Sequence, residues 1–130
     1  MREGNGADIG VLTVDDNDVF RSVVRNVIDA TPGFHPIGEA DSGGAALQAV
    51  QDLRPQLVLL DVRMPGIGGI EAARQIASAH PDVCVVLTSV DDLDGLGPAA
   101  EASGAAGFIR KQNLSPATLH ELWRVHCKNR

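Results

Sequence analysis

The sequence predicts an α/β fold in which a five-stranded parallel sheet is doubly wound, with about five helices on its two faces. Short runs of almost only apolar residues alternate along the chain with segments whose apolar residues recur at helical spacing. Such short apolar runs are typical of strands buried on both faces. Strands that alternate with helices form parallel sheets, and right-handed crossovers restrict their topology.

Five segments are expected to form the strands, the second and the last with weaker patterns. They are Ile9 to Val14, Phe34 to Ala40, Leu57 to Leu60, Val83 to Leu87 and Gly107 to Lys111. The second contains Pro36. Because proline is tolerated mainly on edge strands, this segment is expected at an edge of the sheet.

Helical spacing of apolar residues predicts helices over Val19 to Ile28, Ala46 to Leu53 and Ile70 to Ala77. A last helix has Ser115 as its expected N-cap and Pro116 at its first position, and it places Leu119, Leu122, Trp123 and His126 on one face.

The fourth helix is expected to be short or frayed. The segment Asp91 to Pro98 holds two glycines and a proline before Ala99 to Ser103, and these residues penalise or interrupt a helix. Leu93 to Ala102 is therefore predicted to be mobile.

The length of 130 residues suits one domain, expected over residues 8–128, with residues 1–7 as a flexible leader and no effector domain in the chain. The net charge is −6, with Lys and Arg scattered, so no direct nucleic-acid binding is expected. No run reaches the ~18 apolar residues of a membrane span, and the first six residues lack the apolar core that is typical of a signal peptide. A cytoplasmic protein without membrane contact is therefore predicted.

The two cysteines do not match a known spacing pattern for a metal site or a disulfide. Cys84 lies inside an apolar run and Cys127 near a polar C-terminus. Neither their number nor their spacing suggests a metal site or a disulfide framework, so two free thiols are expected.

Polar side chains follow four of the five predicted strands. They are Asp15 and Asp16, Asp61, Thr88, and Lys111. The carboxyl ends of parallel strands share one edge of the sheet, where ligands bind. Each residue alone has an ordinary explanation, and Asp15, Asp16 or Asp18 could simply cap the first helix. Their common location favours a functional site.

This set of side chains suits phosphoryl transfer. Three carboxylates at one edge repel one another unless a cation compensates them, and Mg²⁺ prefers such oxygen ligands. Lys111 and the Thr88 hydroxyl supply a cation and a hydrogen-bond donor for a phosphoryl group. A carboxylate nucleophile is chemically adequate and would give an aspartyl phosphate.

The assembled motifs resemble the response regulator receiver domain of bacterial two-component systems, a CheY-like family. The resemblance covers residues 9 to 126. It is carried by Asp15-Asp16, by Asp61-Val-Arg-Met-Pro-Gly, by Thr88 after an apolar strand, and by Gly-Phe-Ile-Arg-Lys111. It implies a flavodoxin-like fold with strand order 2-1-3-4-5.

The resemblance also implies a role for each site residue. Asp61 would accept the phosphoryl group from a histidine kinase or a phosphotransfer protein. Mg²⁺, or Mn²⁺, would be held by Asp16 and Asp61 directly, by Asp15 mainly through water, and by the backbone carbonyl of Arg63. No organic cofactor is expected.

Switching is implied by the same resemblance. Lys111 would pair with Asp61 or its phosphate, Thr88 would swing toward the phosphoryl group, and Phe108 matches the family's switch aromatic. The face made by the fourth helix, fifth strand and fifth helix would then change shape and act on an output. Such a domain catalyses only its own phosphorylation and dephosphorylation. A monomer or a weak, phosphorylation-dependent dimer is expected.

One detail of the sequence departs from the family's usual pattern, and another resembles one group within the family. Gln112 stands where many carry proline after the lysine, which leaves the geometry of the Lys111–Gln112 peptide bond open. The stretches Arg54-Pro-Gln-Leu-Val-Leu-Leu-Asp61 and Gly68-Gly-Ile-Glu-Ala-Ala-Arg74 resemble receivers of NarL/FixJ-type transcription factors, which carry a C-terminal DNA-binding domain. A fragment of such a regulator and a free-standing receiver both fit the sequence.

Rival functions use the same residues differently. In a haloacid-dehalogenase-like phosphatase the nucleophile would lie near Asp16-Asn17-Asp18, and the Asp61 motif would be unexplained. A degenerate receiver would act as a binding platform without phosphorylation. A nucleotide-binding module is disfavoured because the turn after the first strand has no glycine-rich loop.

Overall fold

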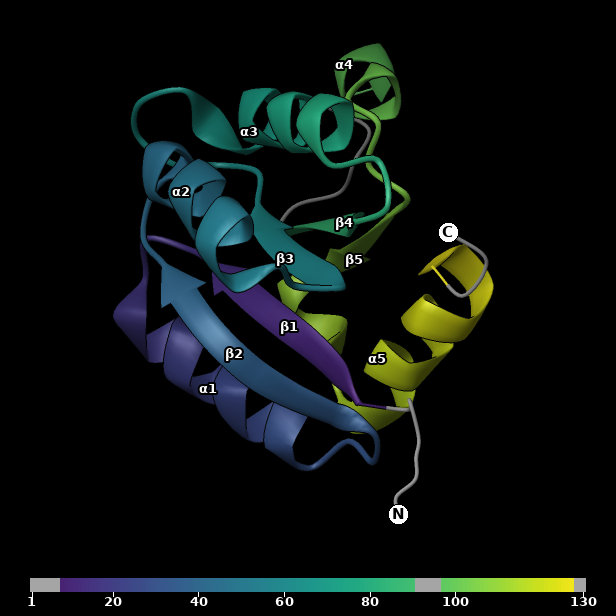
Figure 1. The fold of residues 1–130 in the computed structure, drawn as a ribbon. Helices are drawn as coiled ribbons and strands as arrows, with labels where there is room; N and C mark the ends of the chain where they lie inside the picture. Colours follow the sequence, from purple (N-terminus) through teal and green to yellow (C-terminus); the bar gives the residue numbers. More distant parts are fainter. Residues whose placement is uncertain (1–7, 91–96, 128–130) are drawn as a thin grey trace.

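The computed structural model describes residues 8–90 and 97–127, and it contains the predicted parallel sheet (Figure 1). The strands are β1 (Ile9–Val14), β2 (Phe34–Ala40), β3 (Leu57–Asp61), β4 (Cys84–Ser89) and β5 (Gly107–Arg110). Their order is β2-β1-β3-β4-β5 and every pairing is parallel. The predicted fold class and strand order are confirmed.

Helices connect the strands as expected. They are α1 (Asp18–Asp29), α2 (Gly43–Leu53), α3 (Gly68–Ala79), α4 (Gly97–Ala102) and α5 (Pro116–Leu122), with a 3-10 turn η2 (Lys111–Asn113) and a π-helical turn η3 (Trp123–Cys127). The fourth helix is short, as predicted. The mobility predicted for Leu93 to Ala102 stays a prediction, and residues 93–96 of this range lie outside the described residues.

Two apolar cores lie on opposite faces of the sheet. Helices α2, α3 and α4 cover one face, and α1 and α5 cover the other (Figure 1). Side chains alternate between the faces, so Val58 and Leu60 of β3 belong to the first core and Leu57 and Leu59 to the second. Within the described ranges, no helix has the length and apolar character needed to cross a bilayer.

The edge position of β2 is confirmed. Pro36 lies opposite Val11 of β1, and the register skips Ile37 so that Leu12 pairs with Gly38. An extra residue of this kind is a bulge, which an edge strand accommodates next to a proline that cannot donate to the ladder.

The last helix begins as the sequence predicts and ends differently. The Ser115 hydroxyl accepts from the Thr118 N–H and the Thr118 hydroxyl accepts from the Ser115 N–H, which is a reciprocal cap. Leu119 and Leu122 are buried as expected, but His126 is exposed and Cys127 is buried instead. The π-helical turn η3 adds one residue to the turn, so the buried position falls on Cys127 and not on His126.

The prediction of two free thiols is wrong. Cys84 at the start of β4 and Cys127 at the end of η3 form a disulfide, with their Cα atoms 5.6 Å apart. The two residues are 43 positions apart in sequence, and only the packing of the last helix on the sheet brings them together. Spacing rules for cysteine consider short-range patterns and do not detect such a pair.

Candidate functional site

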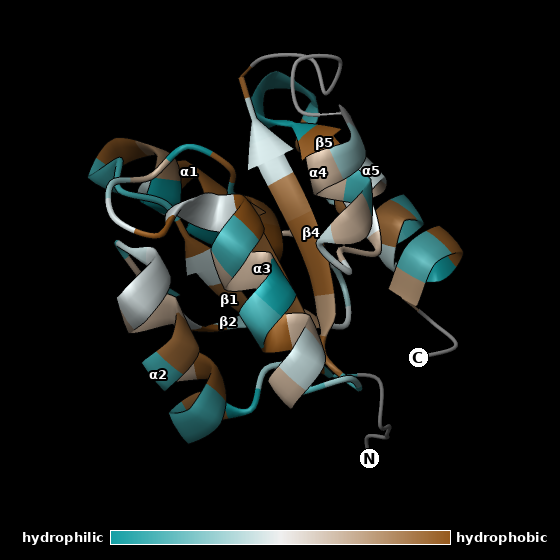
Figure 2. Cartoon of the chain, turned by 90° about the horizontal axis from the view of Figure 1, so that it is seen from above, coloured by the Kyte–Doolittle hydropathy of each residue, from teal (hydrophilic) through white to brown (hydrophobic). Residues whose placement is uncertain are grey.

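The candidate site lies at the carboxyl edge of the sheet, where polar residues end the central strands. Figure 2 shows β4 as hydrophobic along most of its length and of intermediate hydropathy at this end, where the strand sequence has Thr88 and Ser89. Asp15 directly follows β1, Asp61 ends β3, and Thr88 lies opposite Asp61 in the register of β3 and β4. Lys111 follows β5. The parallel arrangement therefore brings side chains from four separate strands to one edge.

Lys111 is shared between two buried carboxylates. Its Nζ lies 2.5 Å from Oδ2 of Asp15 and 3.5 Å from Oδ2 of Asp61. The same ammonium lies 4.5 Å from the centroid of the Phe20 ring, within the range of a cation–π contact. With its side chain only 14% exposed, Lys111 is held between the acidic groups and an aromatic face of α1.

The three aspartates form a group with the donor set of a hard cation. One carboxylate oxygen from each of Asp15, Asp16 and Asp61 lies within 4.8 Å of the others. Asp15 and Asp61 are buried, whereas Asp16 is exposed. The buried Oδ2 of Asp15 has an ion pair with Lys111 but accepts no hydrogen bond from the described residues. An oxygen in this position can accept a metal ion, so the residues present fit Mg²⁺ or Mn²⁺.

The environment of Asp61 disfavours its negative charge. Burial raises the pKa of this carboxyl above its ordinary value of 3.8, and the charge of Asp15 raises the pKa further. Lys111 and the backbone N–H of Arg63, which donates to Asp61 Oδ1 over 3.3 Å, act in the opposite direction. A cation placed between Asp15 and Asp61 would relieve the repulsion that raises this pKa.

Helix capping does not account for the acidic pair. Asn17 is the N-cap of α1, and its Oδ1 accepts from the N–H of Phe20 over 3.0 Å. Asp15 instead accepts from the N–H of Asn17 through Oδ1, and Asp18 is an exposed first residue of the helix. The alternative reading of Asp15 and Asp16 as caps is therefore wrong.

Two residues of α1 make contacts behind the site that were not predicted. Phe20 falls within the predicted helix Val19 to Ile28, and its ring also contacts the Lys111 ammonium. Arg21 donates from Nη1 to the backbone carbonyl of Asp15 over 2.7 Å and from Nε to Glu39 over 3.1 Å. These contacts reach from α1 to residues outside it, so the helical spacing that predicted α1 could not reveal them.

The backbone directly after Asp61 is held by hydrogen bonds to neighbouring elements. The N–H of Val62 donates to the carbonyl of Thr88, and the N–H of Gly69 donates to the carbonyl of Val62, each over 3.0 Å. A Cβ at position 69 would overlap the carbonyl oxygen of Asp61. The start of α3 therefore approaches the end of β3 at a distance that only glycine permits.

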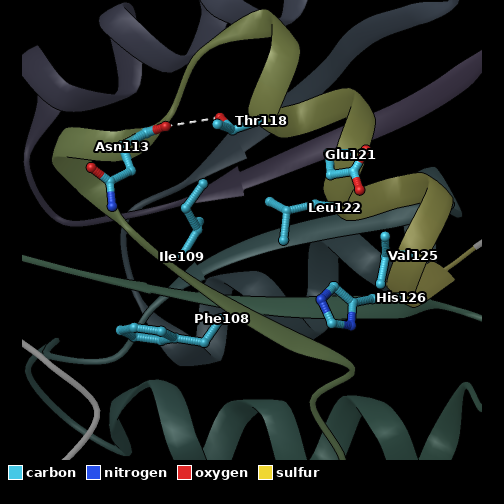
Figure 3. A pocket seen from close by; sticks show the side chains of 8 residues that line it. All are labelled: Phe108, Ile109, Asn113, Thr118, Glu121, Leu122, Val125 and His126. Carbon is cyan, nitrogen blue, oxygen red and sulfur yellow. Dashed lines mark hydrogen bonds between the residues drawn. The ribbon is translucent and has the colours of Figure 1, made fainter.

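The remaining predicted site residues are Thr88, Arg63 and Phe108, and they lie on or directly after β3, β4 and β5. Thr88 is buried and Arg63 is exposed. Phe108 is half-buried and lines a hollow between β5 and α5 (Figure 3). The Lys111–Gln112 peptide is trans, and the Gln112 side chain donates to the carbonyl of Val90 over 3.4 Å.

Comparisons with known proteins identify the family. The sequence profile of the response regulator receiver domain matches residues 11–124. The chain is 41% identical over 103 residues to the response regulator GacA of Pseudomonas viridiflava, which covers 79% of this chain and 48% of that protein. It is 36% identical over 103 residues to the response regulator UvrY of Escherichia coli strain K12, covering 79% and 47%. The chain thus spans about half the length of these relatives.

A solved structure agrees with this assignment. The signal receiver domain of the response regulator NarL from Mycobacterium tuberculosis is 31% identical, with a TM-score of 0.84 over 95% of this chain and 98% of that one. The profile covers most of the described fold, including the strand ends that carry the aspartates and Lys111. The chain therefore belongs to the family of response regulator receiver domains, which are signalling domains.

Proposed function

We propose that this domain accepts a phosphoryl group on Asp61 from a phosphohistidine of a sensor histidine kinase or a phosphotransfer protein. The observation that supports this most is the position of a buried carboxylate at the end of the central strand, beside Lys111 and two further aspartates. In the transfer, an Asp61 oxygen bonds to phosphorus and the phosphorus–nitrogen bond breaks. The phosphohistidine ring carries a proton on its other nitrogen, so it leaves as neutral imidazole. The product is an aspartyl phosphate.

The proposed metal ligands are Asp15, Asp16, Asp61 and the backbone carbonyl of Arg63, with Mg²⁺ or Mn²⁺ as the ion. The support for this site is the cluster of carboxylate oxygens from Asp15, Asp16 and Asp61, which lie within 4.8 Å of one another. A bound divalent cation would neutralise negative charge on the carboxylates and on the phosphoryl oxygens. Lys111 offers a second positive charge, which favours the phosphorylated state electrostatically.

The proposed switch uses Thr88, Phe108 and Lys111. A phosphate on Asp61 would attract the Lys111 ammonium and the Thr88 hydroxyl, and such contacts exist only in the phosphorylated state. Only an interaction that differs between two conformations shifts the balance between them. Movement of Thr88 would change the space available to Phe108 and so the surface formed by α4, β5 and α5.

The output is proposed to be transcriptional control in the cytoplasm. The relatives are full-length response regulators about twice as long as the matched part. We infer that residues 8–128 form the receiver and that a C-terminal DNA-binding domain follows it in the full protein. The receiver itself would act as a monomer or a weak dimer, without contacting nucleic acid or membrane, and would catalyse only its own phosphorylation and dephosphorylation.

Intact mass spectrometry tests this proposal. The chain is incubated with acetyl phosphate, with and without Mg²⁺, beside the Asp61→Asn and Thr88→Ala variants. The expected result is one phosphoryl group that requires Mg²⁺ and is absent from Asp61→Asn. An adduct that persists in Asp61→Asn would support the phosphatase-like chemistry near Asp16 instead. No adduct with either acetyl phosphate or a phosphorylated kinase would indicate a binding platform.

A further inference from the structure

The disulfide has no part in the proposed phosphoryl chemistry. Cys84 is 1% exposed and Cys127 is 2% exposed, and both belong to the core between the sheet and helices α1 and α5. Their Cα separation of 5.6 Å lies within the range that a disulfide spans without distortion of the backbone. The sheet and the last helix therefore already place the two sulfur atoms within bonding range.

The end of the last helix is shaped to bring Cys127 to this position. In an α-helix the residue four positions after Leu122, His126, would take the next inward place. The π-helical turn η3 lengthens the spacing to five residues, so Cys127 is buried and His126 is exposed. Turns of this kind are rare and occur frequently at functional sites.

The bond fixes one wall of a surface hollow. A cavity of about 280 Å³ lies between β5 and the last helix, and Figure 3 shows Phe108 and Ile109 on one side with Leu122, Val125 and His126 on the other. The His126 ring also packs on Gly107, where an added Cβ would lie 3.1 Å from Cδ2. The residues before Cys127 thus form this wall, and the disulfide ties it to β4.

We propose that Cys84 and Cys127 are a reversible redox site that sets how firmly η3 is held on the sheet, and hence the shape of the hollow beside β5. Disulfides in reducing compartments are mostly transient or redox-sensing. The inference rests on the proposed function in one respect, because that proposal places the protein in the cytoplasm, which is a reducing compartment. Its chemistry does not involve Asp61.

The oxidant is a low-molecular-weight disulfide. One protein thiolate attacks a sulfur of that disulfide, which releases one small thiol and leaves a mixed disulfide on the protein. The second protein thiolate attacks the protein sulfur of this bond and releases the second small thiol. The protein loses two electrons and two protons, and the small disulfide becomes two thiols.

Access to the buried sulfur atoms requires local opening of η3. The outer residues Arg124, Val125 and His126 are exposed, so this turn has few buried contacts other than Cys127 and the Trp123 ring. Local opening of such a segment needs less free energy than global unfolding. Cys84, inside the sheet, is expected to react after Cys127.

Thiol counting tests the reversibility. The native chain is equilibrated with mixtures of reduced and oxidised glutathione, quenched with an alkylating reagent under denaturing conditions, and weighed by mass spectrometry. We expect a change from no modified cysteine to two as the proportion of reduced glutathione increases. A disulfide that persists in all mixtures would make the bond purely structural, and two thiols in all mixtures would show that it does not form; either result overturns the proposal.

Hydrogen exchange tests the structural consequence. Reduction should speed exchange at Trp123–Cys127 by roughly tenfold or more and leave α2, on the other face of the sheet, unchanged. The variant Cys127→Ala should exchange like the reduced parent with or without oxidant. Equal exchange at Trp123–Cys127 in the oxidised and reduced parent would overturn the proposed coupling, and this comparison needs no variant.

Phosphorylation is measured separately in the same samples. Because thiol counting and hydrogen exchange do not depend on Asp61, they can succeed where phosphorylation fails, and they can fail where it succeeds. The two proposals are therefore tested independently.

Discussion

The positive charge of Lys111 is shared by the carboxylates of Asp15 and Asp61. Its ammonium is closer to Asp15 than to Asp61, although both carboxylates are buried. A metal ion bound by the aspartates would take over the neutralisation of Asp15 and leave Lys111 available to a phosphate on Asp61. Phe20 keeps the ammonium at this junction from the side of α1.

Replacing Phe20 by leucine tests its role as a positioning residue. A partly desolvated cation–π contact contributes about 1 kcal/mol, so Phe20→Leu should slow phosphorylation by roughly fivefold. In a Lys111→Ala background the same change should have no further effect, because its partner is absent. Rates are measured by intact mass against time. An equal loss in both backgrounds would assign Phe20 a purely structural role, and the exposed Val19→Ala serves as the control.

The raised pKa of Asp61 predicts a stabilising substitution. A carboxyl whose pKa is higher in the folded than in the unfolded state binds more protons when folded, so its contribution to stability falls as pH rises through that interval. Asp61→Asn should therefore increase the free energy of unfolding at pH 7 without Mg²⁺. Below the ordinary value of 3.8 the advantage should disappear.

Urea unfolding at several pH values measures this difference. Asp82→Asn, in an exposed turn before β4, is the matched control and should show no comparable gain. An Asp61→Asn variant that is less stable than the parent at pH 7 would contradict the proposed electrostatic strain.

Most helices and strands were predictable because the local sequence signals favour the same structure as the packing of the fold. The segment Phe34 to Ala40 was expected as an edge strand, and β2 has the same bounds. Its apolar residues favour a strand and Pro36 favours an edge, so the two signals agree. Ser115 and Pro116 likewise mark the start of α5. The turn η3 was not predictable, because the packing of Cys127 against β4 decides it and not helical spacing.

Two glycines near helix starts, Gly69 and Gly44, differ in the space around them. Gly69→Ala in α3 should destabilise the fold and displace Asp61, because the added Cβ overlaps the Asp61 carbonyl. Gly44→Ala in α2 meets no atom within 4 Å and should stabilise by up to about 0.5–1 kcal/mol. Thermal unfolding and the phosphorylation rate are measured for both variants. Similar effects from the two changes would show that the α3–β3 contact is less restrictive than the structure indicates.

The topology of the sheet determined how much of the site could be predicted. The parallel strand order places the ends of β1, β3 and β4 at one edge, so the grouping of Asp15, Asp61 and Thr88 followed from the chain pattern. The contact of Phe20 with Lys111 and the bond between Cys84 and Cys127 join elements far apart in sequence. Such contacts depend on three-dimensional packing, which periodicity does not describe.

Metal binding should stabilise the whole domain. A ligand that binds only the folded state adds about 2.7 kcal/mol at a concentration one hundred times its dissociation constant. Mg²⁺ should therefore raise the melting temperature of the parent by several degrees, and the increase should be smaller for Asp16→Asn, whose carboxylate is exposed. Sodium chloride at equal ionic strength is the control. Equal shifts with both salts would remove the support for a specific metal site.

The position of the phosphoryl group is the most direct test of the proposed function. The chain is phosphorylated with acetyl phosphate and Mg²⁺, reduced with borohydride, which converts an aspartyl phosphate to homoserine, and digested for peptide mass spectrometry. We expect homoserine at position 61 alone, and none in a sample prepared without Mg²⁺. Homoserine at position 15, 16 or 18 in place of 61, or at no position after verified phosphorylation, would contradict the assignment of Asp61 as the acceptor.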